Sequence, residues 1–188
     1  MIELVEERLQ RRDWAGAERQ LDHALGRGDT ARLRVLRGKA RLAQARHAAA
    51  REDFDRAAAL DPGDADAWVG RSLARRLAGD PAGGDEDLAT AAATRPEPAS
   101  LWELRAEWRL ELGDPRGGLD DVDRGLALCG ARPRPRLHLV RGAALQLVGE
   151  VEQAMREYER FLALTPEAPE AGQVRELLRQ FREANPAR

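Results

Sequence analysis

Apolar residues recur along this chain at spacings of three and four positions, the period of an amphipathic helix. The pattern is clearest from Trp68 to Ala78 and from Trp102 to Leu112. Each stretch is followed by glycine, aspartate and proline, as in Gly79-Asp80-Pro81. Glycine can close a helix in the left-handed conformation, aspartate caps the next helix, and proline suits a first helical turn. The pattern therefore predicts pairs of helices joined by tight turns.

The predicted helix pairs repeat along the chain. The segment from Phe54 to Pro62 returns from Leu88 to Pro96 and again from Tyr158 to Pro166. Small residues fall in register at steps of 33, 34, 34 and 36 residues, and a bulky residue follows each of them four positions later. The small positions are Ala17, Ala50, Gly84, Gly118 and Ala154, and the bulky ones are Leu21, Phe54, Leu88, Val122 and Tyr158. Such a period is typical of helical solenoids.

The repeat resembles the tetratricopeptide repeat family over roughly residues 1 to 166. The matching residues are Trp68 and Trp102, Gly38 and Gly142, Ala50 and Ala154, Phe54 and Tyr158, and Pro62, Pro96 and Pro166. The chain departs from the family pattern where repeat one lacks the start of its first helix and where repeat four ends in Cys129-Gly130. The resemblance implies an all-α, right-handed superhelix of five helix pairs.

We expect one domain over residues 1–188, with repeats at about 1–29, 31–64, 65–98, 99–134 and 135–168. A further helix is expected over 169–183, with Val174, Leu177, Leu178 and Phe181 on one stripe. Its other face is polar, which favours a capping helix over the last repeat. A detachable helix that binds a partner is the alternative.

An arginine recurs in the first helix of repeats two to five, and an acidic residue follows each arginine after sixteen positions. Repeat one has Leu4 and Gln20 at these positions, so both partners are absent together. This joint presence and absence predicts an ion pair between the two helices of each repeat. A ladder of arginines that binds phosphates or carboxylates is the alternative. The pairs are Arg37 and Asp53, Arg71 and Asp87, Arg105 and Asp121, and Arg141 and Glu157.

The family resemblance implies that the first helices line a concave side that suits an extended or helical peptide. On this mapping, the candidate partner-binding residues are Arg32, Val35, Leu36, Lys39, Val69, Leu73, Arg76, Glu103, Leu104, Glu107, Glu111, Arg136, Leu139, Val140 and Ala143. The family's carboxylate clamp for chaperone tails needs paired basic and amide residues. Lys39, Gly70, Ser100 and Leu104 do not supply them.

The charge composition limits the class of partner. The net charge of -2 and a pI near 6.0 disfavour a nucleic-acid or membrane-surface binder. Residues 61–130 carry 15 acidic and 8 basic groups, a distribution that would steer a basic partner segment there or would simply be solvated surface. The arginines of the insertion from Gly130 to Arg136 would either contact an acidic partner or lie in a solvated connection.

No residue pattern indicates catalysis, a metal or a cofactor. His23, His47 and His138 lie at unrelated repeat positions, and Cys129 is the only cysteine. The four tryptophans are interpreted as packing groups, although Trp108 lies off the repeat pattern and its exposure is left open.

The acidic N-terminal stretch is not a secretory signal, and no apolar run reaches membrane-spanning length. We therefore expect a protein of a bacterial-type cytoplasm that acts as a non-catalytic adaptor for a partner protein or peptide. A structural subunit or homo-oligomer that packs through its convex face or ends is the alternative.

Repeats three and four carry the glycine pairs Gly83-Gly84 and Gly117-Gly118 early in their second helices. Each glycine costs a helix roughly 1 kcal/mol relative to alanine. We therefore expect the amides of repeats three and four to exchange hydrogen faster than those of repeats two and five. Uniform protection in a hydrogen-exchange experiment on the whole chain would contradict this expectation.

Overall fold

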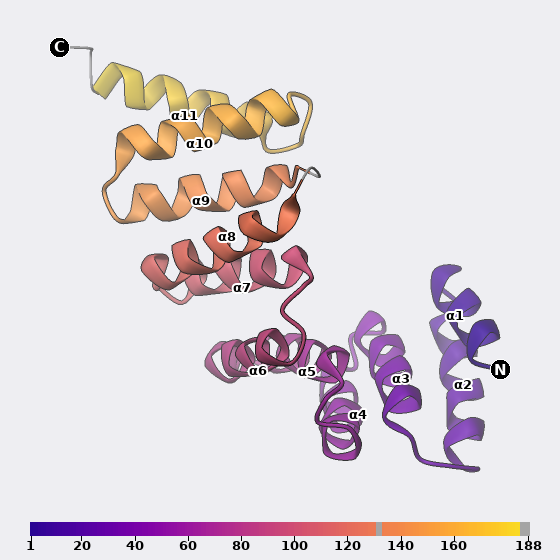
Figure 1. Ribbon diagram of the computed structural model, residues 1–188. Helices are drawn as coiled ribbons and strands as arrows, with labels where there is room; N and C mark the ends of the chain where they lie inside the picture. The colour runs from indigo at the N-terminus through magenta and orange to yellow at the C-terminus, as the bar shows by residue number, and fades with distance from the viewer. Residues whose placement is uncertain (131–132, 185–188) are drawn as a thin grey trace. The chain divides into compact units, whose positions relative to one another are not determined.

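The computed structural model describes residues 1–130 and 133–184, and the regular secondary structure in these ranges is entirely α-helical (Figure 1). The all-α fold predicted from the sequence is confirmed. The described residues form eleven helices in two compact units, one over Met1–Pro96 and one from Glu97 onward.

The first unit holds three helix pairs, and the second holds two pairs and a final helix. The helices of the first unit are α1 (Ile2–Gln10), α2 (Trp14–Leu25), α3 (Ala31–Ala43), α4 (His47–Leu60), α5 (Ala65–Leu77) and α6 (Pro81–Thr94). Those of the second unit are α7 (Ala99–Glu111), α8 (Pro115–Cys129), α9 (Pro135–Leu147), α10 (Val151–Leu164) and α11 (Ala171–Ala184).

The turns within pairs have the predicted chemistry. The side chain of Asp80 accepts a hydrogen bond from the backbone N–H of Gly83 at 2.9 Å, and Asp114 accepts one from Gly117 at the same distance. A proline follows each aspartate in the first helical turn. Gly79 and Gly113 have φ angles of +89° and +79°, which are accessible to glycine at little cost.

The same turn position carries a residue other than glycine in the first two repeats. Arg12 and Ala45 have φ angles of 60° and 58°. Placing a residue with a Cβ in this left-handed region costs roughly 1–2 kcal/mol of conformational free energy. The turns of repeats one and two therefore adopt the common geometry against the preference of their residues.

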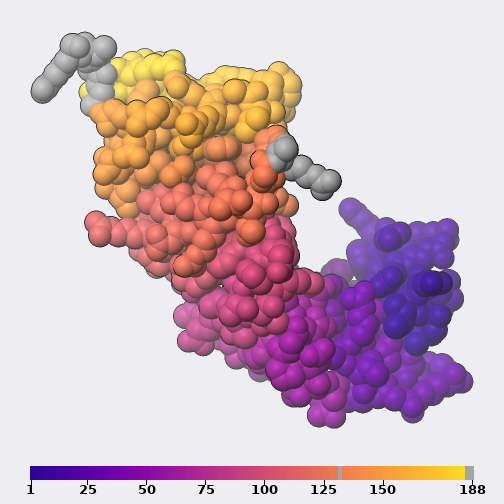
Figure 2. Space-filling view, viewed as in Figure 1, coloured from indigo at the N-terminus to yellow at the C-terminus, as the bar shows by residue number. Residues whose placement is uncertain are grey.

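Helices pack in two layers within each unit. The first helices of consecutive repeats contact each other, α3 with α5 and α7 with α9. Each second helix of an inner pair packs between two first helices, as α4 does between α3 and α5 and α8 between α7 and α9. In the space-filling view, side chains close the spaces between successive helices of a unit (Figure 2).

Glycines in the first helices allow large aromatic side chains of the core to pack directly against the helix backbone. The ring of Phe54 is fully buried between α3 and α5, where a Cβ at Gly38 would lie 2.7 Å from a ring carbon and one at Gly70 would lie 2.2 Å from another. A Cβ at Gly142 would lie 2.6 Å from the ring of Tyr158. Gly38 and Gly142, which match the resembled repeat, are therefore required by packing rather than by backbone conformation.

The final helix covers the last pair. Val174 and Leu178 on α11 are buried against Tyr158 and Phe161 of α10, and the rings of Tyr158 and Phe181 stack with their centroids 6.5 Å apart. The polar residues on the other side of α11 are exposed. This packing is that of a cap on the second unit.

Trp108 is 2% exposed and so belongs to the core, which decides the question that its sequence position left open. No helix in the described part of the chain combines the length and apolar character that a membrane span requires.

The left-handed turn at Ala45 generates a stability prediction. We expect Ala45→Gly to raise the free energy of unfolding by about 1 kcal/mol, because glycine relieves the cost of the positive φ. We expect the reciprocal variant Gly79→Ala to lower it by a similar amount, although a Cβ there would meet no atom within 4 Å. Urea denaturation measures both, and a loss of stability in Ala45→Gly would contradict the explanation.

Candidate functional site

The four predicted ion pairs between facing helices are present. Arg37 binds Asp53 through two hydrogen bonds of 2.6 and 2.9 Å, and Arg71 binds Asp87 with the same two distances. The pairs in repeats four and five are looser. Arg105 lies 3.4 Å from Asp121, and a nitrogen of Arg141 lies 3.6 Å from Glu157. The acidic members of all four pairs are buried.

A second arginine, four positions after the first, reaches the same carboxylate in repeats two to four. Its guanidinium also donates to a backbone carbonyl in the first turn of the second helix, eight positions further along the chain. The sequence analysis missed this column, although its spacing of 34 residues could have revealed it. The arginines are Arg41, Arg75 and Arg109, with distances of 2.8, 3.3 and 3.1 Å to the carboxylates, and the carbonyls are those of Ala49, Gly83 and Gly117.

Repeat five holds its acid differently, because Leu145 stands where the other repeats have the second arginine. Nδ1 of His138 lies 2.7 Å from Glu157, and Arg160 on the same helix as the acid donates to it at 2.7 Å. His138 is therefore part of the packing of its repeat. In the described part of the chain, no group of three or more histidine, cysteine, aspartate or glutamate side chains is arranged to hold a metal ion.

The first arginine of a repeat also reaches back to the second helix of the preceding repeat. Arg37 lies 2.7 Å from Asp22, and Arg71 lies 3.2 Å from Asp55. Arg141 lies 3.0 Å from Asp123. One guanidinium thus joins three helices in these cases. The corresponding position before Arg105 carries Ala89, which has no carboxylate.

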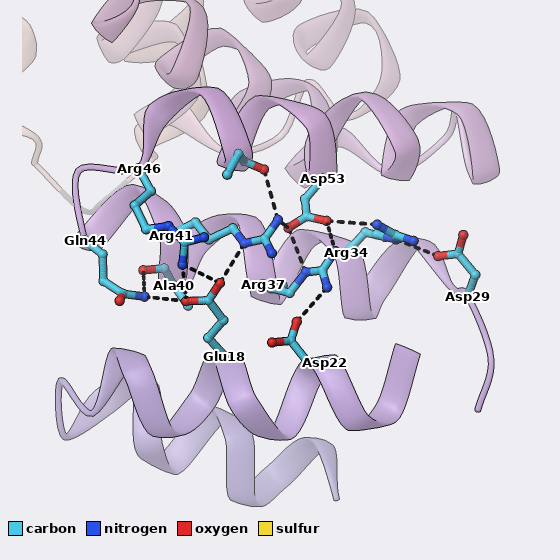
Figure 3. Close-up of polar contacts among 11 residues, drawn as sticks. Glu18, Asp22, Asp29, Arg34, Arg37, Ala40, Arg41, Gln44, Arg46 and Asp53 are labelled. Carbon is cyan, nitrogen blue, oxygen red and sulfur yellow. Dashed lines mark hydrogen bonds and ion pairs between the residues drawn. The ribbon is translucent and has the colours of Figure 1, made fainter. Parts of the chain in front are cut away.

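The cluster around Asp53 shows how these charges offset one another (Figure 3). Three arginines converge on this one carboxylate, which by itself would leave an excess of positive charge. Further carboxylates bind the other sides of the same guanidinium groups. These are Asp29 on Arg34, Asp22 on Arg37, and Glu18 on Arg41.

The pKa shifts follow from these contacts. Hydrogen bonds to Asp53 raise the pKa of Arg37, and those to Asp87 raise the pKa of Arg71, in each case against the effect of burial. Burial by itself would raise the pKa of Glu18, but the hydrogen bonds from Arg41 and Gln44 outweigh it and lower the pKa. The arginines of the ladder are therefore committed to internal carboxylates, which supports the structural interpretation over a ladder that binds an external anion.

The predicted partner-binding residues divide into two groups by burial. Val35, Leu36 and Val140 lie in the hydrophobic core, at 0%, 3% and 6% exposure, so their side chains offer little surface to a partner. They are buried because they point toward neighbouring helices. The other candidates of the first unit lie along α3 and α5. They are Arg32, Lys39, Val69, Leu73 and Arg76.

Several predicted charges bind neighbouring first helices instead of standing free. Arg32 pairs with Glu6 of α1, and Lys39 on α3 lies 2.9 Å from Asp66 on α5. In the second unit, Arg134 lies 2.8 Å from Glu103, and Arg136 bridges Glu107 on α7 to Glu170 before α11. The first-helix layer is thus cross-linked by ion pairs.

The same contacts account for part of the arginine-rich insertion. Arg134 and Arg136 turn onto glutamates of the preceding first helix, so they support the interpretation as a structural connection. Arg132, the other arginine of the insertion, lies outside the described residues.

Two adjoining hollows open on the first-helix face of the second unit, and Leu139 lines both. The first, of about 250 Å³, lies between α7 and α9 and contains six of the predicted residues together with Leu110. The predicted residues are Glu107, Glu111, Arg136, Leu139, Val140 and Ala143. The second hollow, of about 210 Å³, continues toward α11.

The second hollow was not foreseen in detail. Its lining adds Tyr158, Glu170, Gln173, Val174 and Leu177 to Leu139. The apolar stripe of the final helix was visible in the sequence, but its register against α9 depends on how α10 and α11 pack. Glu103 and Leu104, the remaining predicted residues, lie on α7 outside both linings.

Comparison with known proteins identifies the fold. No family model and no curated protein sequence matches the chain. A tetratricopeptide repeat protein from Parabacteroides merdae matches it with a TM-score of 0.81 and 16% identity, over 98% of this chain and 73% of its own. MamA matches with a TM-score of 0.76 and 16% identity, over 85% of this chain and 92% of its own.

A third solved structure, that of YrrB, a TPR protein with an unusual peptide-binding site, matches with a TM-score of 0.74 and 15% identity. It covers 88% of this chain and 85% of its own. At these identities the similarity shows the fold alone. The chain has the helical repeat fold of the tetratricopeptide repeat proteins, as the sequence resemblance implied.

The buried acidic residues Asp53, Asp87, Asp121 and Glu157 form a carboxylate ladder along the repeats, and it generates a stability prediction. Asp53 is 1% exposed and has three arginine partners, whereas the side chain of Asp22 is 51% exposed and has one. We expect Asp53→Ala to lower the free energy of unfolding by about 3–5 kcal/mol, because it leaves three partly buried guanidinium groups without the buried carboxylate that they share. For Asp22→Ala we expect a loss of less than about 1 kcal/mol. Equal losses in urea denaturation would show that the buried ladder does not hold the helices.

Proposed function

We propose that this tetratricopeptide-type fold serves as a non-catalytic binding scaffold whose second unit holds a peptide segment of a partner protein. The observation that carries the proposal is the pair of adjoining hollows that share Leu139. Together they follow one face of the unit from α7 to α11, a path suited to an elongated ligand.

The floor of this path is apolar and its rim is mainly acidic. Leu139 and Leu177 are only partly buried, so each has surface to offer a ligand. Glu107, Glu111 and Glu170 line the hollows together with one cation, Arg136, which is already bound to two of these glutamates. A partner segment therefore gains by presenting apolar residues to the floor and basic residues to the rim.

A short amphipathic helix with leucines on one side and lysines or arginines beside them has the required chemistry. The ligand would be held by apolar burial and charge pairing, with no bond made or broken and no cofactor. A peptide-binding site is also the feature named for YrrB, which shares the fold, and this supports a peptide as the ligand class.

Leu139 provides the direct test, because it faces both hollows and is less buried than Val140 beside it. The probe is a fluorescein-labelled amphipathic peptide of leucine and lysine at helical spacing, and binding is measured by fluorescence anisotropy. We expect Leu139→Gln to weaken binding at least about tenfold, since it places a polar amide in the apolar floor. Leu147→Gln on the same helix is the matched control, because Leu147 is 62% exposed and lies outside the hollows.

The control variant is expected to bind within about twofold of the unchanged chain. Circular dichroism and urea denaturation of both variants establish that the fold is retained. If Leu139→Gln binds as the control does, or if a leucine–glutamate peptide binds better than the leucine–lysine peptide, the proposed face or its partner chemistry is wrong. If Leu139→Gln weakens binding as expected, proteins that the control variant captures from cell extract and Leu139→Gln does not capture identify the partner.

A further inference from the structure

The side chain of Arg136 connects the two hollows of the second unit. Its Nε atom donates to Glu107, which lines the first hollow, and its Nη1 atom lies 3.3 Å from Glu170, which lines the second. Arg136 itself lines the first hollow. A ligand that extends from one hollow into the other therefore meets this bridge as well as Leu139.

The position of Arg136 in α9 does not by itself favour an arginine. Arg136 follows Pro135 in the first turn of the helix, where the positive end of the helix dipole disfavours a cation. The repeat pattern does not require an arginine there either, because the second residue of a first helix varies. The corresponding residues of repeats two, three and four are Arg32, Asp66 and Ser100.

Acidic side chains hold Arg136 in place. The hydrogen bond to Glu107 raises the pKa of Arg136, and the charges of Glu170 and Glu103 act in the same direction. Among the described residues that line the two hollows, Arg136 is the only cation. Its side chain is 54% exposed, so it can leave the two glutamates without any disturbance of the core.

The bridge has the geometry of a guanidinium site. Two different nitrogens of one planar group reach two carboxylates that come from separate segments, α7 and the residues before α11. A guanidinium offers several donors in a fixed plane, whereas the ammonium group of lysine is a compact point charge. The space between Glu107 and Glu170 therefore suits an arginine better than a lysine.

We propose that Arg136 is an internal occupant of the cation subsite in the peptide path, and that the partner binds by replacing it with an arginine of its own. This inference rests on the peptide site proposed for the second unit. The arginine of the partner binds Glu107 and Glu170, its leucines pack against Leu139, and Arg136 turns into solvent. The bridge is thus autoinhibitory, because ion pairs are exchanged on binding rather than gained.

Arg136→Gln tests the exchange, because it removes the competing charge and keeps a polar side chain. The probe is a fluorescein-labelled peptide of leucine and arginine at helical spacing, titrated with the whole chain at low ionic strength. We expect Arg136→Gln to bind this peptide at least about fivefold more tightly than the unchanged chain does. Unchanged or weaker binding would overturn the proposal.

Arg134→Gln is the matched control, with the same change of net charge two residues away. Arg134 lies 2.8 Å from Glu103, and both residues are outside the two hollows. We expect this variant to bind within about twofold of the unchanged chain. An equal gain in both variants would show a general effect of net charge, and the subsite would be wrong.

A purely structural cross-link between α7 and α9 is the alternative role of Arg136, and urea denaturation separates the two. We expect the midpoints of Arg136→Gln and Arg134→Gln to agree, because both arginines form partly exposed ion pairs that solvent screens. A lower midpoint for Arg136→Gln without a gain in affinity would establish the structural role and overturn the proposal.

Salt provides a further check, because an exchange of ion pairs creates less net attraction than new pairs do. We expect added salt to weaken the binding of Arg136→Gln more than that of the unchanged chain, until the two affinities agree near 1 M, where the screening length is about 3 Å. A gain in affinity that persists at high salt would arise from the smaller side chain rather than from its lost charge, contrary to the proposal.

The leucine–lysine peptide tests the preference for a guanidinium. We expect Arg136→Gln to bind the arginine peptide at least about threefold more tightly than the lysine peptide, and Glu107→Gln/Glu170→Gln to remove the difference. Equal binding of the two peptides by Arg136→Gln would overturn the proposed subsite.

Leu139→Gln distinguishes a failure of this inference from a failure of the proposed function. If Leu139→Gln weakens both peptides while Arg136→Gln brings no gain, the peptide site stands and the role assigned to Arg136 is wrong. If Leu139→Gln has no effect on either peptide, the peptide site is wrong and the inference about Arg136 falls with it.

Discussion

The packing of repeats two to five depends on a buried carboxylate in the second helix that arginines of the first helix bind. A charge taken out of water is costly unless it is paired and hydrogen-bonded. Asp53, Asp87 and Asp121 meet this condition only when the two helices lie at the register that places both arginines around the carboxylate. Because the second arginine also binds a carbonyl at the start of the second helix, the same contact positions the turn. The ladder thus specifies geometry, whatever its net contribution to stability.

The ladder also explains which surfaces remain for binding. Its arginines are bound to internal carboxylates, and charges such as Arg136 join adjacent first helices. What the first-helix face of the second unit offers is therefore an apolar path around Leu139 with an acidic rim. Repeat one departs from this pattern, because Gln20 stands where the later repeats have the carboxylate.

The sequence by itself determined the fold and much of its local chemistry. Helical periodicity assigns residues to faces, and the recurrence at 33 to 36 positions assigns helices to pairs. The Gly-Asp-Pro turns follow from conformational preferences that act over a few residues, and they are confirmed at Gly79 and Asp80. The pairing of Arg37 with Asp53 was also predictable, because Leu4 and Gln20 show that both partners are replaced together.

Only the tertiary structure decided how deep each residue lies and how many partners each charge has. Val35 and Leu139 occupy similar faces of their helices, yet Val35 is fully buried and Leu139 lines two hollows. Asp53 binds three arginines from one helix, a number that no pairwise spacing contains. Ala45 adopts a positive φ that its own preference opposes, since the packing of the pair imposes the turn. The periodicity of the sequence determines the direction in which each side chain points around its helix axis. The burial of a residue, the number of partners of a charge and the presence of a cavity depend instead on the distances between helices, and these distances are set only when the repeats pack together.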